Sequence, residues 1–161
     1  MATGRERQVT KQIGEYLVSA ELYRSRFIAT TFTGSNAVAI NDKHETKPIQ
    51  VKTIRGGNWQ FNDVRRFLNV SILNDGKQIV HGKKNLQDPR LIYVFVKLIS
   101  QGKDEFYVIG SKDLQEIIFK GYRKWLEKRG GRRPKNPKSM HTAVSPEDLS
   151  KYRDNWKLLR K

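Results

Sequence analysis

The stretch Ile49-Gln50-Val51-Lys52-Thr53 decides how this sequence is interpreted. Its apolar and polar residues alternate, which predicts a β-strand with successive side chains on opposite faces of a sheet. Gln50 and Lys52 then project together from one face, beside the backbone carbonyl of Val51. Two oxygen ligands next to an ammonium group suit phosphodiester hydrolysis assisted by a hard cation such as Mg²⁺. A strand with one face exposed to solvent and no catalytic role shows the same alternation of apolar and polar residues.

The sequence around this stretch predicts a mixture of helices and strands. Residues 5–26 carry apolar side chains at three- and four-residue spacing, which predicts an amphipathic helix. Asn74-Asp75-Gly76-Lys77 is a strong hairpin signal, because Asp-Gly tolerates positive φ. The segments expected to form strands are residues 27–32, 37–40, 48–54, 59–61, 70–73, 78–80, 91–99 and 106–109.

The second half of the chain ends in helices. Ser111 is expected to cap a helix over 112–129, and the very apolar run 91–99 before it is expected to be a strand buried on both faces. With 161 residues, the chain fits a single domain over 1–161. We expect a core over about 5–129, a basic loop over 130–144 and a C-terminal helix over 145–161. The predicted class is α/β, with a central mixed sheet flanked by helices and a β-hairpin insertion.

The charge balance points to a polyanionic partner. The chain has 32 Lys and Arg residues against 16 Asp and Glu, a formal net charge of +16, and nucleic acid is the commonest partner of such proteins. The absence of cysteine excludes disulfides and thiolate chemistry. No apolar run approaches the roughly 18 residues of a membrane span. We therefore expect a cytoplasmic, nucleoid-associated protein without a membrane partner.

Three segments carry a resemblance to a known family. They are GEYLVSAELYRSRF (14–27), the IQVKT strand and RGGNWQF (55–61). In order and spacing over roughly residues 10–61, they resemble the PD-(D/E)xK nuclease superfamily, in particular a small bacterial and intron-homing branch with a QxK variant motif. The resemblance implies a restriction-endonuclease-like core and cleavage of duplex DNA that depends on Mg²⁺ or Mn²⁺.

The resemblance also implies a set of catalytic residues. Glu15 corresponds to the carboxylate on the first helix, Gln50 to the Glu or Gln of the (E/Q)xK element and Lys52 to its lysine. Asn36 takes the place of the usual Asp ahead of the apolar run 37–40. The implied metal ligands are therefore Glu15, Gln50, the Val51 carbonyl and Asn36.

This ligand set departs from the family pattern in its charge. With Asn36 and Gln50 both neutral, Glu15 is the only anionic candidate, although divalent ions prefer charged oxygens. Asp42 is a conceivable substitute, but it falls in the expected hairpin turn. Glu15 itself is alternatively a solvated helix residue paired with Lys11.

Basic residues are expected to hold the DNA in two places. Residues 120–138 contain nine Lys or Arg and one acid, too many to explain by a helix end alone. The DNA-binding residues expected in this loop are Arg132, Arg133 and Lys135. Those expected around Lys52 are Lys47, Arg55, Arg65 and Arg66. Trp59 and Phe61 either stack on bases or, the interpretation we favour, belong to the core.

The sequence thus predicts a DNA endonuclease weakened by Asn36. The alternatives are a non-catalytic DNA-binding protein on the same fold and a basic RNA-associated protein. Cleavage of both strands requires two sites, so a homodimer or higher symmetric oligomer is expected. Strand 91–99 and the apolar face of helix 112–129 are the surfaces expected to contribute to its interface.

Overall fold

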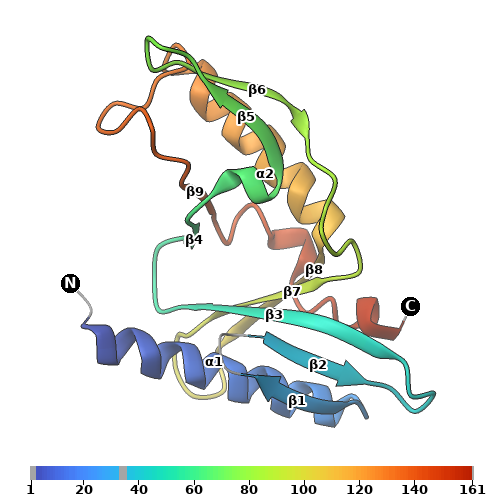
Figure 1. The fold of residues 1–161 in the computed structure, drawn as a ribbon. Coiled ribbons are helices and arrows are strands. Elements are labelled where there is room, and N and C mark those ends of the chain that lie inside the picture. Colours follow the sequence, from blue (N-terminus) through green and yellow to red (C-terminus); the bar gives the residue numbers. More distant parts are fainter. Residues whose placement is uncertain (1–2, 33–35, 161) are drawn as a thin grey trace.

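A five-stranded mixed sheet crosses the middle of the molecule (Figure 1). The structure is a computed structural model that describes residues 3–32 and 36–160. Its strands lie in the order β1-β2-β3-β7-β8. They are β1 (Ile28–Phe32), β2 (Asn36–Ile40), β3 (Thr46–Ile54), β7 (Ile92–Lys97) and β8 (Glu105–Gly110). All neighbours are antiparallel except β3 and β7, which are parallel. The predicted α/β class and mixed sheet are confirmed.

Helix α1 (Gly4–Arg24) covers one face of the sheet (Figure 1). Thr3 and Glu6 form a capping box at its start, which satisfies backbone donors that the helix leaves unpaired. Val18 and Leu22 are fully buried against the alanines of β2 and the odd-numbered apolar residues of β3. These contacts fix α1 beneath the strand that carries Gln50 and Lys52.

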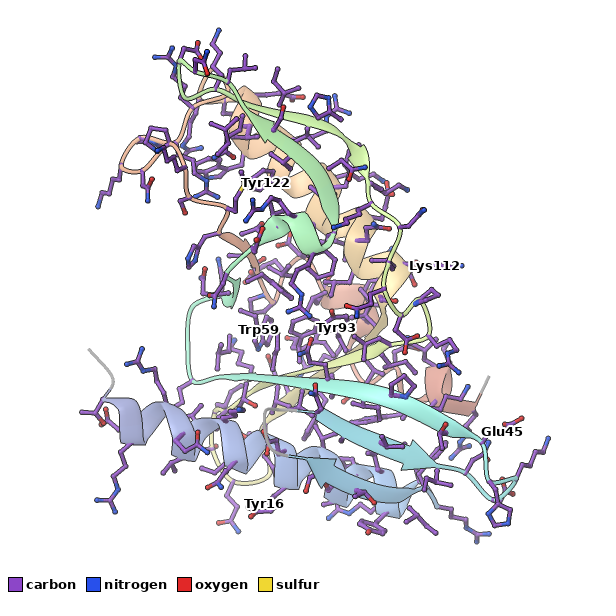
Figure 2. The ribbon with its side chains drawn as sticks, in the orientation of Figure 1. Tyr16, Glu45, Trp59, Tyr93, Lys112 and Tyr122 are labelled. Carbon is purple, nitrogen blue, oxygen red and sulfur yellow. The ribbon has the colours of Figure 1, made fainter. Side chains whose placement is uncertain are left out.

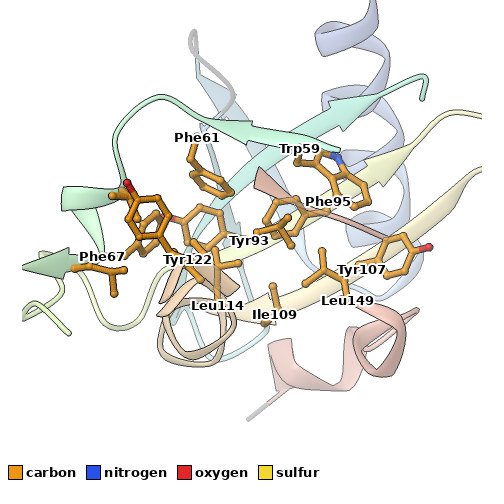
Figure 3. Packing of buried hydrophobic residues seen from close by; sticks show 14 of the residues in the cluster. Trp59, Phe61, Phe67, Tyr93, Phe95, Tyr107, Ile109, Leu114, Tyr122 and Leu149 are labelled. Atoms are coloured by element: carbon orange, nitrogen blue, oxygen red, sulfur yellow. The ribbon is translucent and has the colours of Figure 1, made fainter. Parts of the chain in front are cut away.

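Whereas the C-terminal residues Trp156 and Leu159 pack on the α1 side, the other face of the sheet is covered by a second helix, a hairpin and short elements. Helix α2 (Ser111–Glu127) packs there with the hairpin of β5 (Leu68–Ile72) and β6 (Gln78–Lys83). The pair β4 (Trp59–Phe61) and β9 (Thr142–Val144) and the short helix η1 (Val64–Arg66) complete this layer. Its core is aromatic: Trp59, Phe61 and Phe67 surround Tyr93 and Phe95, which project from β7 (Figure 3). Parallel β3 and β7 are therefore joined by β4, η1 and the β5–β6 hairpin.

Several expected elements are confirmed and others differ at their ends. The Asn74-Asp75-Gly76-Lys77 turn joins β5 to β6, with Gly76 at φ 82°. Strand β7 is buried on both faces, as its apolar run predicts. Ser111 does not cap α2: Gly110 is the N-cap, and Ser111 Oγ instead donates to the Pro89 carbonyl at 3.0 Å.

The C-terminal region departs most from expectation. The expected loop 130–144 contains β9, whose pairing with β4 depends on residues more than 80 positions away and leaves no local pattern. In place of one helix over 145–161, the structure has two short 3-10 helices, η2 (Ser150–Tyr152) and η3 (Trp156–Arg160). Ser145 and Asp148 do exchange the hydrogen bonds of a helix start, but the chain continues as a turn.

The two segments expected at an oligomer interface are mostly buried within the chain. Strand β7 lies between β3 and β8 with both faces covered, and the apolar face of α2 packs into the core. The large apolar side chains that remain exposed include Val9, Tyr16 and Tyr23 on α1 and Ile28 on β1. Tyr16 points away from the sheet (Figure 2). In the part of the chain that is described, neither α1 nor α2 has the length and apolar character of a membrane span.

Candidate active site

Asn36 and Gln50 are direct partners across the β2–β3 ladder. Their side chains share the face opposite α1, because the neighbouring pair Ala37 and Ile49 is buried on the α1 side. This ladder ends at Asn36 and Gln50, whereas β3 continues to pair with β7 as far as Ile54. Among the described residues, the end of β3 after Gln50 therefore has an open edge on the side of β2.

The Val51 carbonyl points toward this open edge. At the end of the strand, the Ile54 carbonyl accepts a hydrogen bond from Leu98 N at 2.8 Å, so the even-numbered residues of β3 direct their carbonyls to β7. Successive peptide groups of a strand alternate in direction. Val51 consequently directs its carbonyl away from β7, toward the side on which no described residue continues the pairing with β3.

Three buried side-chain oxygens near this edge have no hydrogen-bond partner among the described residues. They are Glu15 Oε1, Gln50 Oε1 and Thr53 Oγ1. Buried polar atoms are almost always paired, so each unpaired one needs an explanation, such as a ligand or a water molecule. Glu15 is also not a solvated residue paired with Lys11: its Oε1 is buried, and no ion pair joins the two within the described ranges.

Gly14 explains why Glu15 comes so close to β3. A side chain at position 14 would overlap Thr53 Oγ1, so only glycine lets the helix backbone approach the strand here. Lys11, one turn earlier, lines a cleft of about 300 Å³ together with Gln50 and Lys52. Helix α1 and strand β3 are thus in close contact at Gly14 and Thr53, although Glu15 is not among the residues that line the cleft.

Lys52 is held between the sheet and β4. Its Nζ donates to the Gln60 carbonyl at 3.1 Å and lies 4.4 Å from the centroid of the Phe61 ring. Burial lowers the pKa of Lys52, and the positive charge of Arg66 lowers it further. An ammonium group in this setting is a readier proton donor than a solvated lysine.

The basic cluster expected around Lys52 is present only in part. Arg66 lies close enough to influence the pKa of Lys52 and also that of Tyr93, which burial raises. Arg55 donates to Thr10 Oγ1 at 3.0 Å, so it lies beside the first half of α1. Arg65 instead forms an ion pair with Asp63 at 2.7 Å.

Lys47 is not part of this cluster. It precedes Lys52 by five residues on the same strand, so its side chain points to the opposite face and lies about 16 Å further along β3. It lines a separate cavity with residues of the 89–92 segment. The expectation that Lys47 surrounds the site is therefore wrong.

Trp59 and Phe61 belong to the core and are only 1% and 2% exposed. Trp59 Nε1 donates to the Val96 carbonyl at 3.3 Å, and its ring contacts Phe95 edge to face (Figure 3). Neither ring is free to stack on a base. The interpretation of these aromatics as core residues is confirmed.

The basic loop is tied to the rest of the protein. Arg132 forms an ion pair with Asp75 at 2.8 Å, and the Arg133 guanidinium lies 4.8 Å from the centroid of Trp125. Lys135 is exposed. Two of the three cations expected to bind DNA from this loop therefore have fixed positions on the protein surface.

The sequence did not identify Gln60 and Tyr93 as part of the site. Tyr93 is the register partner of Gln50 across the parallel β3–β7 ladder, so it shares the face of Gln50 and Lys52. Figure 2 shows Trp59 and Tyr93 between the sheet and the layer above it. No local pattern could have placed β7 beside β3, because 37 residues and a hairpin separate them.

The residues at the open edge fit a hard cation in ligand type but not in charge. Oxygen atoms of Glu15, Gln50 and Val51 are the kind of ligand that Mg²⁺ and Mn²⁺ prefer. Within residues 3–32 and 36–160, however, no group of three or more His, Cys, Asp or Glu side chains is arranged to hold a metal. Asp42 does not supply the missing charge, because it lies in the β2–β3 turn, at the far end of the ladder from Gln50.

No family model matches this chain, and no curated protein or solved structure matches it significantly. The resemblance to the PD-(D/E)xK nucleases therefore rests on the sequence segments that carry it.

Proposed function

We propose that this protein is a metal-dependent endonuclease of duplex DNA, built on a restriction-endonuclease-like core. One observation carries the proposal: Glu15 and Gln50 have buried, unpaired oxygens, and Gln50 shares a strand face with the desolvated ammonium of Lys52. Burying unpaired oxygens and an ammonium group lowers the stability of the folded protein. Groups of this kind are typical of functional sites. The formal net charge of +16 supports a polyanionic substrate.

In this proposal, Glu15, Gln50, the Val51 carbonyl and Asn36 hold a Mg²⁺ or Mn²⁺ ion. When bound, such an ion would lower the pKa of water and withdraw charge from the phosphate. Glu15 contributes the only negative charge among these ligands. The phosphate of the DNA therefore has to contribute to metal binding, so that metal and substrate bind together.

Lys52 acts on the phosphate and its nucleophile. Its Nζ keeps one hydrogen bond to the Gln60 carbonyl, which orients the amine and leaves its other donors available. In a partly buried site, this positive charge stabilises the negative charge that develops on the phosphate oxygens. Arg66 attracts the same phosphate from the side of η1, where its charge already acts on Lys52.

A second function has its own support. Asn36 and Gln50, the two residues that face each other at the site, are both neutral. A protein with these residues can retain the DNA-binding charge while it binds metal too weakly for catalysis. A non-catalytic DNA-binding protein on the same fold is therefore the alternative.

Cleavage of both strands would require a second copy of the site. The proposal therefore includes a homodimer or a higher symmetric oligomer on the DNA. A monomer with one site would nick one strand and release the DNA.

Two assays separate these functions. Purified protein is incubated with supercoiled plasmid in Mg²⁺, in Mn²⁺ and in EDTA, and its binding to duplex DNA is competed with structured RNA at a stated salt concentration. The endonuclease proposal expects nicked or linear plasmid with a divalent ion only. Duplex binding without nicking would favour the non-catalytic alternative, and preference for RNA would contradict both.

A further inference from the structure

A second pocket adjoins the cleft of Lys52. Its volume is about 380 Å³, and it lies between β4, β9, α2 and the loop before β9. Gln60 lines both cavities, and its carbonyl accepts a hydrogen bond from Lys52 Nζ. The polar and aromatic side chains around this pocket include Asn58, Tyr122, Trp125, Arg133, Thr142 and Asp148.

Arg133 is held firmly in this pocket. Its guanidinium carbon lies 4.8 Å from the ring centroid of Trp125 and 5.6 Å from that of Tyr122. One of its terminal nitrogens donates to the His141 carbonyl. Cation–π contacts and this hydrogen bond fix the orientation of the guanidinium before any ligand arrives.

The Nε–H group of Arg133 is left without an acceptor. Nε is buried and has no hydrogen-bond partner among the described residues. A buried donor on a charged group is expensive to leave unpaired. A ligand oxygen would satisfy this donor. The terminal nitrogen that forms a fork with Nε is the one that donates to the His141 carbonyl, so its second hydrogen is the one left for a phosphate oxygen.

One acidic residue that lines this pocket, Asp148, would repel a bound anion. The Oδ2 of Asp148 already accepts hydrogen bonds from both the backbone N and the Oγ of Ser145, each at 2.9 Å. These bonds stabilise the carboxylate in place and leave Arg133 to act on the ligand. Asn58, Gln60 and Thr142, which also line the pocket, carry no charge.

We infer that Arg133 forms a phosphate-binding site, which holds a backbone phosphate of the DNA strand that also reaches Lys52. The inference rests on the proposed function for the identity of the strand, because Gln60 connects this pocket to the cleft of Lys52. It differs from the sequence prediction, in which Arg132, Arg133 and Lys135 all bind DNA: here the contact is a single fixed guanidinium, and neighbouring Arg132 forms an ion pair with Asp75.

The first test observes Arg133 in the unmodified protein. The Nε–Hε NMR signals of Arg133 and Arg132 are assigned by their loss in Arg133→Lys and Arg132→Lys, and a short DNA duplex is added without divalent ions. The Arg133 signal is expected to shift at saturation and the Arg132 signal to move less. An Arg133 signal that does not respond to saturating duplex would overturn the inference.

The second test measures the salt dependence of duplex binding for Arg133→Gln, with Arg132→Gln as the matched control and thermal unfolding as the check on folding. For Arg133→Gln, the loss of one phosphate contact is expected to reduce the slope of log K against log salt concentration by about 0.9 and to lower the affinity at low salt roughly tenfold. Arg132→Gln is expected to show neither effect. Equal slopes in the two variants would contradict a specific site. Neither test involves cleavage. If the Arg133 signal shifts but the protein does not nick plasmid, the proposed nuclease function is refuted and the proposed phosphate-binding site is retained.

Discussion

Asn36 and Gln50 face each other at the last described pair of the β2–β3 ladder, on the sheet face that also carries Lys52. Two neutral amides thus occupy the position where a metal-dependent nuclease is expected to have carboxylates. The pairing explains how the fold can offer a site of the right shape with too little negative charge. It also defines the change that would restore that charge.

Asn36→Asp is expected to increase Mg²⁺-dependent cleavage by about tenfold or more, because a second anionic ligand strengthens binding of a hard cation. Asn36 is exposed, so the change should leave the fold intact. Initial nicking rates across a Mg²⁺ titration measure the effect. Asn69→Asp on β5 adds the same charge away from the site and should change nothing. If Asn36→Asp neither binds Mg²⁺ more tightly nor cuts faster, the site is misplaced.

Glu15→Gln is expected to weaken Mg²⁺ or Mn²⁺ binding by at least about tenfold, because it removes the only anionic ligand. Binding of duplex DNA without metal should be unchanged or slightly tighter, since a negative charge near the phosphate is lost. Calorimetric titration with Mn²⁺ and a shift assay in EDTA separate the two effects. Glu21→Gln, further along α1 and paired with Arg24, is the control. Equal metal binding by the two variants would exclude Glu15 as a ligand.

Gly14→Ala is expected to lower the free energy of unfolding by roughly 1–3 kcal/mol, because the new methyl group would overlap Thr53 Oγ1. Gly121→Ala on α2 has open space around it and should instead raise stability by roughly 0.5–1 kcal/mol. Urea unfolding compares the two variants. A stabilised Gly14→Ala would mean that α1 does not approach β3 as closely as the structure has it.

Lys52→Met should alter how stability depends on pH. Burial lowers the pKa of Lys52 from its ordinary value of 10.5, so the folded protein loses this proton at a lower pH than the unfolded chain. The unfolded chain binds more protons in that interval, and the stability of the parent therefore rises with pH up to about the ordinary lysine pKa.

The variant lacks this contribution, so its stability relative to the parent should be most favourable near neutral pH and should decline as the pH rises toward that of free lysine. Urea unfolding at a series of pH values follows the difference. A difference that stays constant with pH would show that Lys52 is not desolvated.

The parts of the fold that depend on local pattern could be predicted from the sequence. Three- and four-residue spacing predicts that α1 is a helix but not which face is buried, because Val9, Tyr16 and Tyr23 are exposed and Val18 and Leu22 are buried. Alternation predicts β3, and the Asp75-Gly76 turn predicts the β5–β6 hairpin. Alternation also places Lys47 on the face opposite Lys52, so its assignment to the site could have been avoided from the sequence alone.

Other features depend on contacts between distant segments. Tyr93 joins the site only through the parallel β3–β7 register, and β9 exists only because it pairs with β4. Arg132 is neutralised by Asp75, 57 residues away. Composition indicates that a basic loop is present, but it does not show which of its cations are already occupied.

The most direct test of the central claim compares Lys52→Ala with Lys47→Ala in plasmid nicking with Mg²⁺ or Mn²⁺ under single-turnover conditions. The two lysines lie on one strand and point to opposite faces. Each variant's affinity for the duplex is measured alongside. We expect Lys52→Ala to nick about a hundredfold more slowly while it still binds DNA, and Lys47→Ala to nick at nearly the parent rate. Equal nicking by parent and Lys52→Ala, or no nicking by the parent with either ion, would contradict the proposed active site.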